Sequence, residues 1–159
     1  MKLHLFTIII FFLLVIYSAN IFTVKAGEVN TIELLTQQIK AQKGQVIYVD
    51  FWASWCIPCR KSFPWMNELQ SKYKAQGLQI ISINLDHNKA LADKFLEKNP
   101  VNFPIIYDPK GSISRKYKLK GMPSSFIINK DGQVISKHTG FNNEKSLAYE
   151  QEIIHLLNN

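Results

Sequence analysis

Cysteine is scarce in this sequence of 159 residues, which contains only Cys56 and Cys59. Two thiols are too few for a small secreted protein whose fold is held together by disulfides. Acidic residues are also in the minority, with 12 Asp and Glu against 19 Lys and Arg. The basic residues are spread along the chain with acids among them, so we interpret them as a solvated surface and expect no nucleic acid among the partners.

Ligands for a metal ion are also few. A metal site normally needs three or four ligands, but no second cysteine pair is present, and His87, His138 and His155 each stand alone. We therefore expect no metal. Internal repeats and low-complexity segments are missing, and a hydrophobic content of 47% excludes a disordered chain. The length suits one domain with its own core, which we expect to act as a monomer.

A long hydrophobic run occurs only at the N-terminus, in "MKLHLFTIIIFFLLVIYSANIFTVKAGEVN". The run is strongly apolar over residues 5–17, and Val24 and Ala26 suit a signal-peptidase site. Residues 1–26 are predicted to be a signal peptide or, since the run is about long enough to span a bilayer, an N-terminal membrane anchor. Either way residues 27–159 are expected in the periplasm or another extracytoplasmic compartment, where thiols tend to be oxidised.

Hydrophobic patterning predicts helices that alternate with short buried strands. Helical spacing is present over 31–42, 58–77, 88–99, 112–119 and 143–157. Runs of β-branched and aromatic residues predict strands at 45–52, 78–84 and 103–108, and a hairpin of 124–129 and 133–139 around "KDG". The alternation indicates an α/β fold with a central sheet flanked by helices, and the final hairpin makes that sheet mixed.

Both cysteines lie in "DFWASWCIPCRK", residues 50–61, where a predicted strand ends and a predicted helix begins. Three interpretations compete: a structural crosslink, half of a metal site and a reactive dithiol. A disulfide across so short a loop restricts the unfolded chain little, and further metal ligands are missing. A helix N-terminus stabilises a thiolate, and Arg60 and Lys61 add positive charge. These features favour the reactive dithiol.

"VDFWASWCIPCRK" together with "GMPSSFIINKDGQV" resembles the thioredoxin superfamily, and most of all its exported TlpA-like branch of DsbE-like and ResA-like proteins. The resemblance, over residues 45–140, implies a thioredoxin-like fold for 27–159 and thiol–disulfide exchange. It implies no cofactor other than a redox-active disulfide between Cys56 and Cys59. The implied partners are proteins with disulfides or oxidised thiols and a membrane thiol reductant that supplies electrons. Cytochrome c maturation is a role found in this branch, although Ser62 stands where many members have a glutamate.

The two cysteines are expected to have different roles. Cys56, at the exposed start of the helix, is predicted to be the attacking nucleophile, and Cys59, one turn later and more buried, to resolve the mixed disulfide. Trp55 is expected to cover the active-site surface, and Ile57 to tune contact with the substrate. Pro58 removes one backbone donor and presets a helical φ in the first turn.

Pro123 follows Met122 in the second motif. The resemblance implies that the Met122–Pro123 peptide bond is cis and faces the cysteines. A cis bond would turn the backbone of Met122 outward, where an extended substrate could pair with it. Without the resemblance, an ordinary trans proline before a strand is the expectation.

Asp50 interrupts the apolar run "VIYVDFW". A lone buried carboxylate is costly when ionised, so burial should raise its pKa. Beneath the dithiol, such a carboxylate could take the proton from Cys59. The alternative is that strand alternation turns Asp50 outward to a solvated loop. We favour the catalytic role, which the resemblance supports.

The sequence therefore predicts an exported thiol–disulfide oxidoreductase that reduces protein substrates through Cys56 and Cys59. A disulfide-donating oxidase of the same fold is the main alternative, and a metal carrier or binding module is the third. Pro58 and the lack of histidine between the cysteines favour a reductant. A metal carrier would be expected to have a histidine or methionine ligand near the cysteines, and none is evident.

Overall fold

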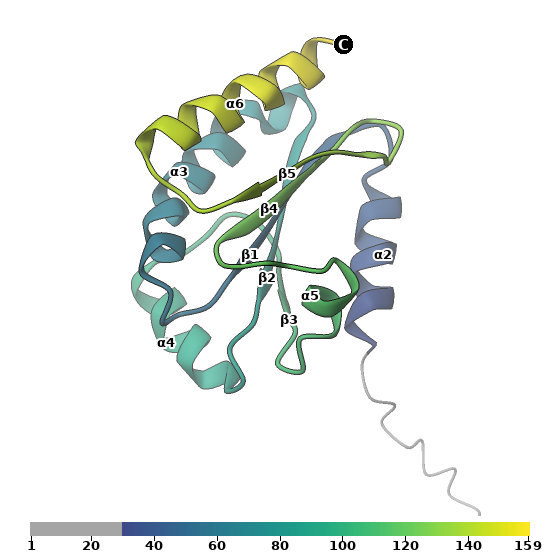
Figure 1. Ribbon diagram of the computed structural model, residues 1–159. Coiled ribbons are helices and arrows are strands. Elements are labelled where there is room, and N and C mark those ends of the chain that lie inside the picture. The colour runs from purple at the N-terminus through teal and green to yellow at the C-terminus, as the bar shows by residue number, and fades with distance from the viewer. Residues whose placement is uncertain (1–29) are drawn as a thin grey trace, which may run out of the picture.

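The computed structural model describes residues 30–159, which form one five-stranded sheet with helices on both faces (Figure 1). The strands are β1 (Val46–Trp52), β2 (Leu78–Asn84), β3 (Ile105–Tyr107), β4 (Ser124–Ile128) and β5 (Val134–Thr139). Their order in the sheet is β3-β2-β1-β4-β5. β2 pairs parallel with β1 and β3, whereas β4 pairs antiparallel with β1 and β5. The predicted α/β fold with a mixed sheet is confirmed.

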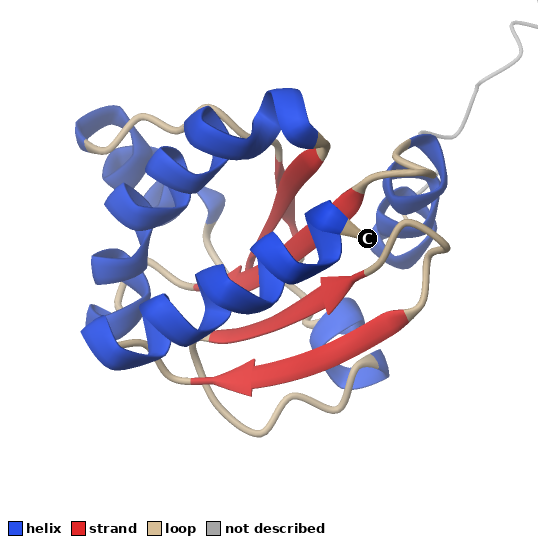
Figure 2. Ribbon diagram, turned by 90° about the horizontal axis from the view of Figure 1, so that it is seen from above, coloured by secondary structure: helices blue, strands red, loops and turns tan. Residues whose placement is uncertain are grey.

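Helices cover both faces of this sheet. They are α2 (Thr31–Ala41), α3 (Ile57–Tyr73), α4 (Lys89–Lys98), α5 (Ser112–Lys116) and α6 (Asn143–Asn158), with a short 3-10 helix η1 (Lys74–Gln76) after α3. α3, α4 and α6 pack on one face, and α2 and α5 on the other (Figures 1 and 2). The C-terminal ends of the parallel strands β1 and β2 therefore meet the starts of α3 and α4 at one edge of the sheet.

Each face of the sheet has its own hydrophobic core. Under α3 and α4, the ring of Trp52 packs against Phe63 and Phe95, with centroids 4.6 and 5.3 Å apart. On the opposite face, Phe51 packs edge-on against Phe126, with centroids 5.6 Å apart. β1 is buried along its whole length because it is central and covered on both faces. This position explains its nearly continuous apolar run.

α3 begins at the CxxC and carries its second cysteine. The helix ends at Tyr73 rather than at 77 as predicted, because the chain tightens into η1 before Gly77 takes φ +98°. Pro64 lies inside α3 without ending it. The helix therefore runs without interruption from the cysteines to η1, which leads into the start of β2.

Two other elements are shorter than predicted. β3 starts at Ile105 rather than at 103, because Pro104 has no N–H to donate to a ladder. α5 ends at Lys116 rather than at 119, because Lys118 takes φ +52°, outside the right-handed helical region. The other boundaries differ from the prediction by one residue at most.

No helix within residues 30–159 is both long and apolar enough to cross a membrane. The predicted signal peptide or anchor, residues 1–26, lies outside the described residues.

Candidate active site

The two cysteines lie at the junction of β1 and α3 and are joined by a disulfide, with an S–S distance of 1.98 Å. Cys56 is the N-cap of α3, and its Sγ accepts a hydrogen bond from the backbone N–H of Cys59 at 3.3 Å. Cys59 is fully buried in the core beneath α3. The start of the helix thus gives the Cys56 sulfur one backbone donor and buries the Cys59 sulfur.

Cys56 is more covered than we predicted, with only 6% of its surface exposed. It lies in a shallow hollow that is also lined by Trp55, Ile57, Pro58 and Met122. Trp55 and Ile57 are 66% and 65% exposed, so they present apolar surface at the hollow that contains Cys56. The prediction of an exposed nucleophile is therefore wrong for the Cys56 side chain as a whole, which lies in a hollow lined by residues that are predicted to contact a substrate.

The electrostatic surroundings of Cys56 favour a thiolate. The first turn of α3 contains no acidic residue, and the positive end of the helix dipole lies at Cys56. Arg60 and Lys61 follow on the exposed side of the same turn. Both features stabilise negative charge on sulfur, which is the nucleophilic form of cysteine.

A cis peptide bond joins Met122 to Pro123, as the resemblance implied. The loop around it is fixed by two hydrogen bonds: the Ser124 hydroxyl donates to the Gly121 carbonyl at 2.7 Å, and the Gly140 N–H donates to the Pro123 carbonyl at 2.8 Å. Gly121 and Met122 line the hollow that contains Cys56. Residues more than 60 positions apart are thereby brought together, while substrate binding by Met122 stays a prediction.

Asp50 is buried in the middle of β1, with 1% of its surface exposed. It points to the same face as Tyr48 and Trp52, the face that α3 and Cys59 cover. Burial raises the pKa of its carboxyl from 3.8 to about 8. The alternative, in which Asp50 turns out to a solvated loop, is therefore wrong.

The neighbours of Asp50 across the sheet are small hydroxyl residues. Ser82 of β2 and Ser125 of β4 lie directly opposite Asp50 in the two pairings of β1. No hydrogen bond reaches Oδ2 of Asp50 from any described residue, nor is Ser82 Oγ bonded. A buried carboxylate with an oxygen that lacks a donor is poorly stabilised, so the neutral acid is the favoured form of Asp50 at neutral pH.

Sequence reasoning missed Asp86, which fixes the loop before the cysteines. Asp86 is 2% exposed, and its carboxylate accepts hydrogen bonds from the Ser54 N–H and hydroxyl, both at 2.9 Å. The side-chain amide of Asn84 donates to the same carboxylate at 2.7 Å. These bonds tie the end of β2 to the segment between β1 and α3. The one signal in the sequence is the pair of polar residues in "NLD" directly after a buried strand.

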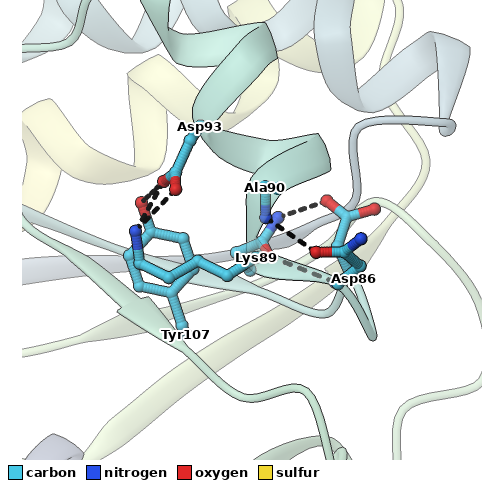
Figure 3. A network of polar contacts seen from close by, with 7 residues as sticks. Asp86, Lys89, Ala90, Asp93 and Tyr107 are labelled. Atoms are coloured by element: carbon cyan, nitrogen blue, oxygen red, sulfur yellow. Dashed lines mark hydrogen bonds and ion pairs between the residues drawn. The ribbon is translucent and has the colours of Figure 1, made fainter.

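Asp86 lies just before α4, beside a second polar network (Figure 3). The Lys89 ammonium bonds both carboxylate oxygens of Asp93, at 2.6 and 2.8 Å, and the Tyr107 hydroxyl donates to Asp93 at 2.9 Å. This network joins α4 to β3. It holds the helix that covers Trp52 and does not reach the cysteines.

The histidines each have a separate structural partner. His87 Nδ1 lies 2.9 Å from the Pro109 carbonyl, and His138 Nε2 lies 3.1 Å from the Glu152 carboxylate. Over residues 30–159, no group of three or more His, Cys, Asp or Glu side chains is placed to hold a metal ion.

Comparison with known proteins identifies the family. The family model described as Redoxin matches residues 24–153. The thiol-disulfide oxidoreductase ResA of Bacillus cereus (strain ZK / E33L) is 36% identical over 117 residues, covering 73% of this chain and 68% of the relative. ResA of Bacillus subtilis (strain 168) is 34% identical over 98 residues, covering 62% of this chain and 55% of the relative. The chain thus spans between about half and two thirds of these curated relatives.

Solved structures agree with this assignment. A structure described as a thiol:disulfide interchange protein DsbE from Chlorobium tepidum has 49% identity and a TM-score of 0.73, and covers 75% of this chain and 84% of that chain. StoA from Bacillus subtilis has 28% identity and a TM-score of 0.59, and covers 69% of this chain and 84% of that chain. The predicted thioredoxin-like fold is confirmed. The chain belongs to the Redoxin family, as a thiol–disulfide oxidoreductase of the ResA and DsbE type with Cys56 and Cys59 as its CxxC pair.

Proposed function

We propose that this protein is exported and reduces disulfides in other extracytoplasmic proteins. The observation that carries the proposal is the difference between the two sulfurs. Cys56 caps α3 and is reached from a surface hollow, whereas Cys59 is fully buried. A substrate disulfide therefore meets Cys56 first, and Cys59 acts from inside the protein.

The reaction consists of two thiol–disulfide exchanges. The Cys56 thiolate attacks one sulfur of the substrate disulfide, forms a mixed disulfide and releases the other substrate sulfur as a thiolate. Cys59 loses its proton, attacks Sγ of Cys56 and releases the second substrate thiolate. Two electrons pass to the substrate, and the product is the Cys56–Cys59 disulfide that the structure contains.

Asp50 is the base that we assign to the second exchange. It lies on the face of the sheet that Cys59 covers, and its pKa of about 8 is close to that of a thiol. The proton of Cys59 passes to the Asp50 carboxylate as the new disulfide forms. When the protein is reduced again, the same proton returns to the leaving Cys59 sulfur.

The hollow around Cys56 suits an extended segment of a substrate. Trp55, Ile57 and Pro58 offer an apolar surface, and the backbone of Met122 is the edge with which the segment pairs. Binding of this kind needs one copy of the chain, so we propose that the protein acts as a monomer.

Ile57 and Pro58 between the cysteines support reduction rather than oxidation. A membrane thiol reductant would return the electrons, and the N-terminal run would be the export signal, as a cleaved signal peptide or a membrane anchor. The likeness of this protein to DsbE and ResA suggests one candidate substrate class, which is cysteines that become oxidised before cytochrome c maturation.

Trapping of mixed disulfides in the exporting cell tests this function. The Cys59→Ser variant should accumulate substrates bound to Cys56, and the Cys56→Ser variant should trap none. Equal trapping by both variants would overturn the assignment of roles. Equilibration with glutathione then tests the direction of electron transfer. A reductant should have a midpoint potential closer to about −270 mV, and a value of about −120 mV would indicate the disulfide donor instead.

A further inference from the structure

A groove with three lysines lies beside the loop that carries the cis peptide bond. Lys118 and Lys120 come from the connection between α5 and β4, and Lys137 comes from the edge strand β5. Figure 2 shows this connection passing along the outer side of β5. We call this feature, with a volume of about 420 Å³, the lysine groove.

The lysines of the groove lack counter-charges. All three are exposed, and within residues 30–159 no carboxylate forms an ion pair with any of them. Other lysines do form such pairs, as Lys72 does with Glu150 and Lys89 with Asp93. Like charges along one groove repel each other. An anionic occupant would remove this repulsion.

The end of α5 sets the backbone conformation at Lys118. Its φ of +52° is the only positive value among the described residues other than glycine. This conformation is that of a Schellman motif, which ends α5 with a residue in the left-handed region and places Lys118 at the groove. The loop is held there by hydrogen bonds from the Lys118 N–H to the Arg115 carbonyl and from the Leu119 N–H to the Ser114 carbonyl, both at 3.1 Å.

The lysine groove lies next to the hollow that contains Cys56. Lys120 lines the groove, and its neighbour Gly121 lines the hollow. Gly121 also packs beside Thr139, another residue of the groove, since a Cβ at 121 would lie 3.6 Å from Thr139 Cγ2. An extended chain advances about 3.3 Å per residue. A segment bound at Met122 therefore reaches the groove within a few residues of its cysteine.

We propose that the lysine groove binds acidic residues of the substrate polypeptide that lie close to its reactive cysteine. This inference rests on the proposed function, and it names the class of substrate that the site prefers. Lysine ammonium groups are point charges on flexible stems, which suits carboxylates at variable positions. Tyr117 and Phe126 supply an apolar lining for the stems of glutamate side chains, and Lys137 lies over the Phe126 ring at 5.3 Å.

Peptide kinetics test the proposal with the whole reduced protein. Three peptides carry one cysteine in a mixed disulfide with thionitrobenzoate, flanked on each side by Glu, Gln or Lys residues. Release of the coloured thiolate reports attack by Cys56. A variant with Lys118→Gln, Lys120→Gln and Lys137→Gln removes the groove charges. A control with Lys40→Gln, Lys43→Gln and Lys98→Gln removes the same charge from other exposed positions.

At low salt, the natural protein and the control should react about tenfold faster with the Glu peptide than with the Gln peptide. The groove variant should react with both at nearly equal rates, and high salt should abolish the preference of the natural protein. An equal loss of preference in both variants would show long-range attraction by net charge and overturn the proposal. So would a natural protein that reacts with all three peptides at the same rate.

Sedimentation with vesicles containing phosphatidylserine separates a membrane role from substrate binding. Loss of vesicle binding in the groove variant, with its Glu preference unchanged, would make the groove a lipid contact and overturn the proposal. No reaction of the natural protein with any of the three peptides would instead overturn the proposed function on which the inference rests.

Discussion

Replacement of Asp50 by asparagine should stabilise the oxidised protein, by an amount that grows with pH. Asp50 is 1% exposed, and burial raises its pKa to about 8. In the unfolded chain the same carboxyl ionises near pH 4, at about 3.9. Asparagine has nearly the same size and carries no charge in either state. The difference between the two proteins therefore reports the ionisation of Asp50.

The size of the effect follows from the two pKa values. Below pH 4 the carboxyl holds its proton in both states, and its ionisation does not affect stability. Between pH 4 and 8 the unfolded state loses the proton and the folded state keeps it, so the free energy of unfolding falls by about 1.4 kcal/mol per pH unit. The accumulated loss is about 4 kcal/mol at pH 7, and it levels off near roughly 6 kcal/mol above pH 8.

Urea unfolding of both oxidised proteins between pH 5 and pH 8, followed by tryptophan fluorescence, measures this difference. The Asp50→Asn variant should gain about 4 kcal/mol over the natural protein across this range. Asp131→Asn is the matched control: Asp131 is exposed in a turn, so its variant should follow the natural protein at every pH. If the free energy of unfolding of the Asp50→Asn variant and that of the natural protein change in parallel with pH, Asp50 is not a buried carboxyl that stays neutral.

Two further substitutions test the loops on either side of the cysteines. Asp86→Ala leaves the Ser54 N–H and the Asn84 amide without their acceptor. The free energy of unfolding measured in urea should therefore fall by about 3 kcal/mol, and attack by Cys56 should slow. An unchanged stability would mean that water replaces the carboxylate. Lys118→Gly should raise the free energy of unfolding, measured by thermal unfolding, by about 0.5–1 kcal/mol, because glycine adopts φ +52° without strain. The control Lys116→Gly, inside α5, should lower it by a similar amount. Destabilisation by both glycines would show that Lys118 is not strained.

Features that depend on neighbouring residues could be predicted from the sequence. β1 was evident from its apolar run, and the CxxC was placed at the start of α3 because a strand and a helical pattern meet there. The same run, together with the resemblance, favoured a buried Asp50 over one turned outward. The cis bond before Pro123 came from the resemblance alone, since nothing local in the sequence distinguishes it from a trans bond.

Features that depend on tertiary contacts could not be predicted. Asp86 lies 32 residues from Ser54, and a single aspartate after a strand does not reveal which backbone it will bond. Cys56 shares its hollow with Met122, which comes from a loop distant in the sequence. The lysine groove is formed by Lys137 and by lysines nearly 20 positions earlier. In the sequence these lysines appear dispersed, and only the pairing of β4 and β5 brings them together.

The burial that destabilises Asp50 should also make it an effective base, and the Asp50→Asn variant tests this in kinetics. An ordinary aspartate lies more than four pKa units below a thiol at about 8.5, so proton transfer from Cys59 to it would be uphill by roughly 6 kcal/mol. A pKa of about 8 reduces that gap to about half a unit. At pH 7 about one molecule in ten then carries the ionised carboxylate, and this fraction rises to about half at pH 8 and about nine tenths at pH 9. In stopped-flow experiments with a disulfide substrate, resolution by the natural protein should therefore accelerate between about pH 6 and pH 8 and level off at about pH 9. The Asp50→Asn variant should lose this pH dependence and release the second substrate thiolate at least about tenfold more slowly at pH 7.

The first attack by Cys56 should be unchanged in the Asp50→Asn variant, because the start of α3 activates Cys56 without Asp50. Equal rates of resolution in the two proteins at pH 7 would mean that the buried carboxyl destabilises the fold without taking part in the chemistry.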